Sequence, residues 1–174
     1  MKKTLTILLL ALFTVFTSFA QKAGDKISFS SKDINGQTIT SEIFSNNKLT
    51  MINMWGTFCP PCIREMPDLA ELNKENASNG VQIAGIIIDL TDGKGNILPK
   101  QKKDADLIIE KTGATYTHIV PNPAMFSTFL RNIQAVPSTI FVDNTGKMVG
   151  EMYLGARSKK EWQKIIDDLL KEIK

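Results

Sequence analysis

Metal-ligating and bridging side chains are scarce in this sequence of 174 residues, which has one histidine, His118, and two cysteines, Cys59 and Cys62. A tetrahedral zinc or iron–sulfur site needs four ligands, so metal binding at the cysteines is disfavoured and no bound metal is expected. Two cysteines are also too few for the disulfide framework that holds small exported domains together. The pair is therefore not needed to staple the fold.

Charge is absent from residues 4–19, which are mostly Leu, Ile, Phe, Val and Thr. The basic Lys2-Lys3 precedes this stretch and the small residue Ala20 ends it, which is the order of regions in a secretory signal. We expect cleavage after Ala20 and export to the periplasm or another extracytoplasmic space. An uncleaved membrane anchor is the alternative, although it needs about 20 apolar residues. A lipoprotein anchor is excluded because Gln21, not a cysteine, follows the site.

An excess of positive charge is also missing once the signal is set aside. Without residues 1–20, Lys plus Arg falls from 21 to 19 against 18 Asp plus Glu, so the net charge drops from +3 to +1. Nucleic acid and anionic surfaces are therefore not expected as partners. Residues 21–174 have the length of one domain without internal repeats or a dividing linker, and we expect a monomer.

The rest of the chain alternates strand-like and helix-like segments. Apolar or alternating runs predict strands at 27–30, 37–40, 49–55, 81–90, 116–120, 138–142 and 147–154. Helical patterns and caps predict one helical turn at 41–44, helices at 63–77, 104–111, 124–132 and 158–173, and a loop at 91–103. Strands alternating with helices before a closing antiparallel pair predict an α/β fold, in which helices cover both faces of a mixed central sheet.

The two cysteines lie three residues apart, between the apolar strand 49–55 and the helix predicted from Ile63. Near a helix N-terminus, free N–H groups and the helix dipole favour a thiolate. A static bridge is the alternative, but it closes so small a loop that it restrains the unfolded chain little. Cycling between dithiol and disulfide explains the placement better, with Cys59, at the exposed helix start, attacking and Cys62, one turn further in, resolving the mixed disulfide.

Two segments together carry a family resemblance, Asn-Met-Trp-Gly-Thr-Phe-Cys-Pro-Pro-Cys at 53–62 and Val-Pro-Ser-Thr-Ile-Phe-Val-Asp-Asn-Thr-Gly-Lys at 136–147. The chain resembles exported thioredoxin-like proteins of the TlpA/ResA type over essentially all of residues 21–174. The resemblance implies a thioredoxin fold with an N-terminal β-hairpin extension and a central insertion. It also implies thiol–disulfide oxidoreductase activity with no cofactor other than the redox-active cysteine pair.

The resemblance further implies a peptide-binding surface beside the cysteines. Pro137 falls where thioredoxin-like proteins hold a cis-proline against the dithiol, so Val136 and Pro137 are expected to form a lip that pairs with a substrate chain. Phe58, Pro60 and Pro61 are expected to contact substrate as well. Taken alone, Val-Pro before a strand indicates only an edge-strand or turn proline.

Glu65 lies one helical turn after Cys62, where ResA-like members carry an active-site glutamate. A carboxyl near a partly buried dithiol has its pKa raised by desolvation and can accept the proton of the resolving thiol. The alternative is a solvated glutamate on the helix surface. Asn53 occupies the position of the buried aspartate of thioredoxins proper, so the proton role of that aspartate is absent here or is shifted to Glu65.

By resemblance, the protein is expected to reduce disulfides of exported proteins and to be recharged by a membrane thiol transporter of the DsbD/CcdA kind. Expected substrates include apocytochrome c, oxidised methionine sulfoxide reductases and wrongly bridged exported proteins. One alternative is a thioredoxin-fold binding or scaffold domain with an inert disulfide. Another is a peroxiredoxin-like peroxidase, which needs a Thr-x-x-x-Cys spacing, whereas Thr57 lies only two residues before Cys59.

Two further polar features are interpreted as structural. His118 lies in an alternating strand and no motif links it to a serine or cysteine, which favours a structural role. Asp89, Asp92 and Asn96 lack the spacing and the closing glutamate of a calcium loop, so a surface turn is expected there.

Overall fold

The structure, a computed structural model, describes residues 24–173. The expected signal segment and its cleavage after Ala20 lie outside these residues. Within them, no helix is both long enough and apolar enough to span a bilayer.

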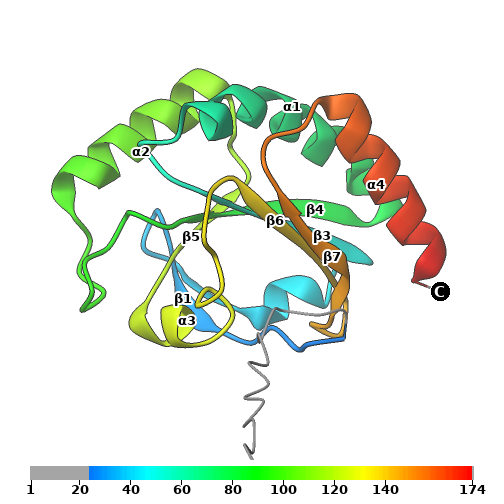
Figure 1. Cartoon of the computed structure of the whole chain (residues 1–174), viewed down its shortest axis with the longest axis horizontal. Coiled ribbons are helices and arrows are strands. Elements are labelled where there is room, and N and C mark those ends of the chain that lie inside the picture. The colour runs from blue at the N-terminus through cyan, green and yellow to red at the C-terminus, as the bar shows by residue number, and fades with distance from the viewer. Residues whose placement is uncertain (1–23, 174) are drawn as a thin grey trace, which may run out of the picture.

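A seven-stranded mixed sheet forms the centre of the molecule (Figure 1), with the strand order β2-β1-β5-β4-β3-β6-β7. The pairs β3–β4 and β4–β5 are parallel, and the remaining neighbours are antiparallel. The strands are β1 (Ser30–Asp33), β2 (Thr38–Thr40), β3 (Leu49–Trp55), β4 (Val81–Ile87), β5 (Thr117–Val120), β6 (Ser138–Asp143) and β7 (Met148–Leu154).

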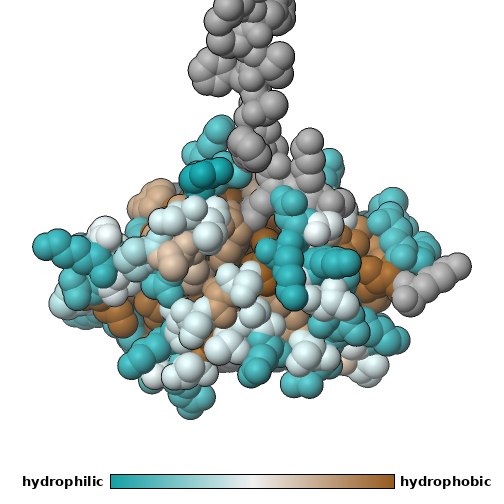
Figure 2. Space-filling view, turned by 90° about the horizontal axis from the view of Figure 1, so that it is seen from below, coloured by the Kyte–Doolittle hydropathy of each residue, from teal (hydrophilic) through white to brown (hydrophobic). Residues whose placement is uncertain are grey.

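Helices cover both faces of this sheet, as predicted. Helices α1, α2 and α4 lie on one face, while α3 lies on the other (Figure 1). On that second face, hydrophilic residues lie around much of the rim, and hydrophobic residues show between them both at the rim and nearer the centre (Figure 2). The helices are α1 (Pro60–Asn76), α2 (Pro99–Thr112), α3 (Pro123–Ser127) and α4 (Lys159–Glu172), with 3-10 turns η1 (Ser41–Phe44) and η2 (Ala77–Asn79).

Strand β3 lies near the middle of the sheet and leads directly to the cysteines. All seven of its residues are buried, and it has the predicted bounds. Its side chains alternate between two cores: Met51 and Trp55 pack with α1 and α4, and Ile52 and Met54 pack on the opposite face. The strand is therefore a rigid base for the segment that follows it.

The N-terminal hairpin is confirmed, but its first strand is Ser30–Asp33 rather than 27–30. The carboxylate of Asp33 accepts hydrogen bonds from the backbone N–H groups of Asn35 and Gln37, which fixes the turn and sets Ser30 opposite Thr40. The predicted strand at 27–30 begins earlier in the chain, where the Ile27 N–H donates a hydrogen bond to the Gly146 carbonyl oxygen. Ile27 therefore anchors the N-terminal segment beside the β6–β7 turn instead of pairing in the hairpin.

Four other predicted boundaries were wrong. Helix α1 begins at Pro60 rather than at Ile63, because proline is well suited to the first positions of a helix. Helix α2 begins at Pro99, within the predicted loop, because ion pairs Lys100–Asp104 and Lys102–Asp106 one turn apart support its first turns. Strand β4 ends at Ile87, where a turn begins in which the Leu90 N–H donates to the Ile87 carbonyl. Helix α3 ends at Ser127, well before residue 132, because the Thr128 backbone leaves the helical conformation.

Candidate active site

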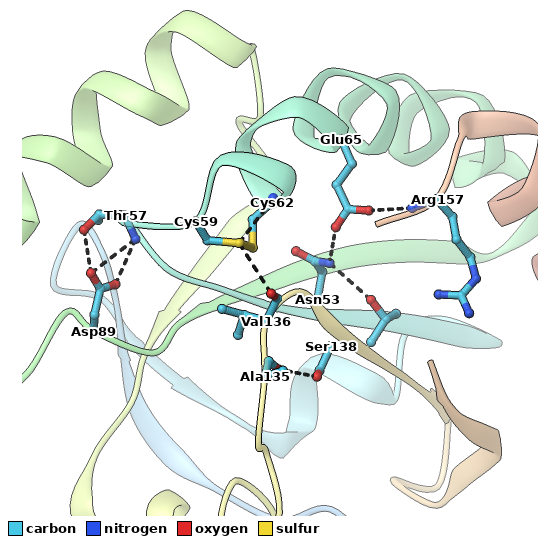
Figure 3. The surroundings of a disulfide bond; sticks show 11 residues. Asn53, Thr57, Cys59, Cys62, Glu65, Asp89, Ala135, Val136, Ser138 and Arg157 are labelled. Atoms are coloured by element: carbon cyan, nitrogen blue, oxygen red, sulfur yellow. Dashed lines mark hydrogen bonds between the residues drawn. A yellow bond between two sulfur atoms is a disulfide. The ribbon is translucent and has the colours of Figure 1, made fainter. Parts of the chain in front are cut away.

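The two cysteines form a disulfide at the N-terminus of α1 (Figure 3). Cys59 is the N-cap residue, and its Sγ atom accepts a hydrogen bond from the backbone N–H of Cys62 at 3.3 Å. Pro60 and Pro61 fill the first positions of the helix, where a missing N–H removes no intrahelical hydrogen bond. The helix end therefore presents its positive dipole and a backbone donor to the Cys59 sulfur.

The two sulfur-bearing residues differ in access. Cys62 is fully buried, and Cys59 is 4 % exposed, so the exposed helix start expected for Cys59 was wrong. Cys59 nevertheless lines a groove of about 360 Å³, and Cys62 does not. The other lining residues are Phe58, Pro61, Ile88, Ile133, Gln134, Ala135 and Val136. A molecule in the groove therefore reaches Cys59 first.

The groove is mostly apolar and has no charged lining residue. Phe58 is 64 % exposed at its edge, and the apolar lining residues Ile88, Ile133 and Val136 are partly exposed. Of the residues expected to contact substrate, Phe58, Pro61 and Val136 line the groove. Pro60 is exposed outside it, and Pro137 is buried and does not line it. The groove therefore offers apolar contacts beside Cys59, the cysteine that lines it.

The loop before β6 faces the disulfide from the other side. The Val136-Pro137 peptide bond is cis, as expected from the resemblance. Val136 is partly exposed and Pro137 is buried. The Val136 carbonyl oxygen lies 3.6 Å from the Cys59 Sγ atom (Figure 3). A backbone acceptor is therefore held next to the sulfur that borders the groove.

Glu65 is buried beneath the active-site end of α1, with 4 % of its surface exposed, so the solvated-surface alternative was wrong. Its Oε1 atom accepts a hydrogen bond from Asn53 Nδ2 at 3.0 Å. Its Oε2 atom accepts from the backbone N–H of Arg157 at 3.2 Å and from Trp162 Nε1 at 3.4 Å. Burial raises the pKa of Glu65, and these hydrogen bonds and the Arg157 charge oppose the rise.

Asn53 connects Glu65 with the sheet. It is fully buried, and its Nδ2 group donates to Glu65 and also to Thr139 Oγ1 at 3.1 Å. Thr139 lies directly opposite Asn53 in the β3–β6 pair, so the sheet register itself positions this contact. The amide therefore ties α1 to two central strands directly behind the cysteines.

Asp89 holds the segment before Cys59 in place, a role that the sequence did not predict. Its carboxylate accepts a hydrogen bond from the Thr57 N–H at 3.0 Å and another from the Thr57 hydroxyl (Figure 3). The segment that Asp89 holds runs directly into Cys59. The available signal was positional: Asp89 follows β4, whose end lies beside the end of β3 because Trp55 pairs with Ile87.

His118 has the hydrogen-bonding pattern of a structural residue. It is buried in β5, its Nδ1 accepts from Trp55 Nε1 at 3.2 Å, and its Nε2 donates to the Ala114 carbonyl at 2.7 Å. Burial lowers the pKa of His118 to about 4. Gly85 leaves the room for this ring, since a Cβ there would collide with it. In residues 24–173, no cluster of three or more His, Cys, Asp or Glu side chains is arranged to hold a metal ion.

Known proteins that are similar to this chain include thiol–disulfide oxidoreductases. The profile of the AhpC/TSA family matches residues 23–151. The thioredoxin-like protein YneN of Bacillus subtilis is 24 % identical over 139 residues, which cover 80 % of this chain and 75 % of that protein. The thiol-disulfide oxidoreductase ResA of Halalkalibacterium halodurans is 25 % identical over 132 residues, covering 76 % of this chain and 68 % of that protein.

Solved structures confirm the thioredoxin fold. A crystal structure of a thiol:disulfide interchange protein, a thioredoxin family protein from Chlorobium tepidum TLS, superposes with a TM-score of 0.69 at 24 % identity. The superposition covers 88 % of this chain and 99 % of that one. Secreted Mycobacterium tuberculosis and Corynebacterium glutamicum proteins, described as a disulfide oxidoreductase and a thiol-disulfide isomerase, have TM-scores of 0.61 and 0.67 at 20 % and 21 % identity.

Proposed function

This chain belongs to the AhpC/TSA family, and we propose that it is a thiol–disulfide oxidoreductase that reduces disulfides of exported proteins through Cys59 and Cys62. The names of its ResA relatives support the general activity. The observation that carries the proposal is the unequal access of the two cysteines at a helix N-terminus: Cys59 borders the groove, and Cys62 is buried behind it.

In the proposed cycle, the Cys59 thiolate attacks one sulfur of a substrate disulfide. A bond forms between Cys59 and that sulfur, and the second substrate sulfur leaves as a thiolate. The Cys62 thiolate then attacks Cys59, forms the intramolecular disulfide and releases the first substrate sulfur. Two electrons pass from the enzyme dithiol to the substrate, and a dithiol of a DsbD/CcdA-type membrane transporter restores them.

The substrate is proposed to be an extended polypeptide rather than a small polar molecule. The apolar groove beside Cys59 fits the side chains that flank a substrate cysteine, and the partly exposed Val136 provides backbone groups for pairing. Candidate substrates are apocytochrome c, methionine sulfoxide reductases and wrongly bridged proteins in the periplasm or another extracytoplasmic space. The chain is proposed to act there as a monomer without a bound cofactor.

A peroxiredoxin-like peroxidase is less well supported. Thr57 does not have the required spacing from Cys59, and its hydroxyl is donated to Asp89. The direct discriminating measurement is peroxide consumption by the reduced protein. Slow consumption relative to disulfide reduction is expected, whereas rapid consumption that needs Cys59 would favour the peroxidase.

Cys62→Ser is expected to trap substrates as stable mixed disulfides on Cys59, because the thiol that releases them is gone. The reduced variant is mixed with a peptide whose single cysteine is disulfide-bonded to glutathione, so that no second peptide thiol reverses the attachment, and adducts are measured by mass spectrometry after acid quench. Nearly stoichiometric attachment at Cys59 supports the proposal. Attachment at Cys62 in a Cys59→Ser protein, with none in the Cys62→Ser protein, would reverse the assignment.

Glu65 is proposed to accept the Cys62 proton during resolution, because it is a buried carboxyl one turn further along the same helix face. Burial raises its pKa, so Glu65 becomes protonated as the pH falls, and a protonated carboxyl cannot accept the proton. Resolution is therefore expected to slow below this raised pKa.

Glu65→Gln tests this role in rapid-mixing measurements of mixed-disulfide decay across pH. We expect decay at least about tenfold slower than in the wild type above the Glu65 pKa, and loss of the step in the pH profile. Glu71→Gln is the matched control, because Glu71 lies on the same helix but is exposed and pairs with Lys159. An unchanged rate and profile in Glu65→Gln would exclude Glu65 as the acceptor.

A further inference from the structure

The carboxamide of Asn53 has one satisfied end and one unsatisfied end. Its Nδ2 group donates to Glu65 and Thr139. Its Oδ1 atom is buried and accepts no hydrogen bond from any residue in the described range 24–173. Unsatisfied buried acceptors are uncommon in folded proteins because the lost hydration is not replaced, so each one needs a reason.

The direction of this oxygen follows from the groups around it. The side of the amide that faces Glu65 has to be the NH₂ group, because two oxygens would repel each other there. Asn53 also lies between Met51 and Trp55 on the β3 face that packs with Cys62 and α1. Figure 3 shows the Asn53 oxygen on the side of the amide where the disulfide lies, away from its contacts with Glu65 and Thr139.

The buried cysteine is the group whose hydrogen-bonding capacity changes with redox state. In the disulfide, the Cys62 sulfur carries no proton and has nothing to donate. Reduction adds two electrons and two protons to the pair, and the Cys62 thiol then has an S–H donor. Because Cys62 is fully buried, water cannot reach it as a competing acceptor.

We propose that Asn53 is a positioning residue for Cys62, whose thiol donates a hydrogen bond to the Asn53 carboxamide oxygen in the reduced protein. Reduction then satisfies an acceptor that oxidation leaves unpaired, which favours the dithiol. The contact also keeps the proton on Cys62 while Cys59 attacks. When Cys62 later resolves the mixed disulfide, its proton passes to the proposed proton acceptor, Glu65, and the hydrogen bond to Asn53 is lost.

This inference rests on the proposed redox cycling of the pair, but its test needs no protein substrate. The equilibrium between the Cys59–Cys62 disulfide and the dithiol is measured against dithiothreitol, with acid quench, alkylation and mass spectrometry. Asn53→Leu is expected to shift the equilibrium toward the disulfide about three- to tenfold, the effect of losing one hydrogen bond in the reduced state. Failure of this shift leaves the trapping result with Cys62→Ser unaffected.

Thr139→Val is the matched control. It removes an acceptor of the Asn53 NH₂ group but leaves the carboxamide oxygen in place. It is expected to lower the stability of the oxidised and reduced forms equally and to leave the equilibrium within about twofold of the wild type, because no redox-dependent hydrogen bond is removed. Equal shifts in Thr139→Val and Asn53→Leu would overturn the proposal, since general loosening of the site would then explain both.

A spectroscopic measurement covers the case in which Asn53→Leu does not fold. In Cys59→Ser, Cys62 is the only thiol, so the S–H stretching band in the Raman spectrum reports its hydrogen bond. Asn53→Ala in this background is expected to move the band to higher frequency, toward that of a free thiol. An unmoved band would show that the Cys62 thiol does not donate to Asn53.

Discussion

Cys59→Ser is expected to lower the rate of disulfide reduction by at least about a thousandfold, the loss typical for removal of a catalytic nucleophile. Cys59 borders the groove, and its Sγ atom accepts a hydrogen bond from the Cys62 backbone N–H at the helix N-terminus. Cys62, in contrast, is fully buried. A serine hydroxyl at this position remains protonated and cannot open a disulfide. The measurement is reduction of insulin with dithiothreitol as the recycling reductant.

Cys62→Ser provides the control for this loss. It also removes turnover, but it leaves the first step, so a labelled peptide disulfide should still react once with Cys59 at a rate near that of the wild type. Cys59→Ser should not react in the same single-turnover assay. More than about a tenth of the wild-type rate in Cys59→Ser would contradict the assignment of Cys59 as the attacking thiol.

His118 is expected to make the fold sensitive to acid. Its pKa lies at about 4 in the folded protein, against 6.5 for an unperturbed histidine. Between these values the unfolded chain binds a proton that the buried ring does not bind, so the free energy of unfolding falls as the pH is lowered through this range. The full difference corresponds to a loss of about 3 kcal/mol between pH 7 and pH 4.

Urea denaturation of the wild type and His118→Gln at several pH values measures this contribution. The variant is expected to be less stable at pH 7, because it loses the hydrogen-bonding geometry that joins Trp55 to Ala114, but its stability should decline less toward pH 4. Glu65 has the opposite influence, since its raised pKa lets the folded state take up a proton first. Glu65 is present in both proteins, so its contribution cancels when the wild type is compared with His118→Gln. Parallel curves of unfolding free energy against pH for the two proteins would exclude His118 as the cause of the acid sensitivity.

The parts of the fold that the sequence predicted well are those set by local pattern. Strand β3 is a continuous buried run, and α4 begins at the capping box in which Ser158 and Glu161 exchange hydrogen bonds. Helix α2 lacked such a signal, because Ala105 is its one fully buried residue and its exposed polar first turn resembles a loop. The first hairpin strand was misplaced because alternation alone does not distinguish pairing with β2 from packing against the β6–β7 turn.

In the candidate site, too, the features set by neighbouring residues were predicted and those set by distant residues were not. The cysteine pair, the helix start and the two prolines follow from neighbouring residues, and the cis bond at Val136-Pro137 followed from the family resemblance. The burial of Glu65 could not be predicted from neighbouring residues, because its hydrogen-bond donors Arg157 and Trp162 lie 92 and 97 residues away in the sequence. Only the packing of α4, and of the residues just before it, against α1 brings these donors together, and no local sequence pattern predicts that packing.

A redox titration of the wild-type Cys59–Cys62 pair against dithiothreitol tests most directly whether the pair cycles. A cycling pair is expected to show one reversible two-electron transition less negative than about −300 mV, nearer to the thioredoxin value of about −270 mV than to the value of about −120 mV for the oxidant DsbA. A potential below about −300 mV, or a disulfide that resists reduction in the folded protein, would contradict redox cycling and favour an inert structural bridge.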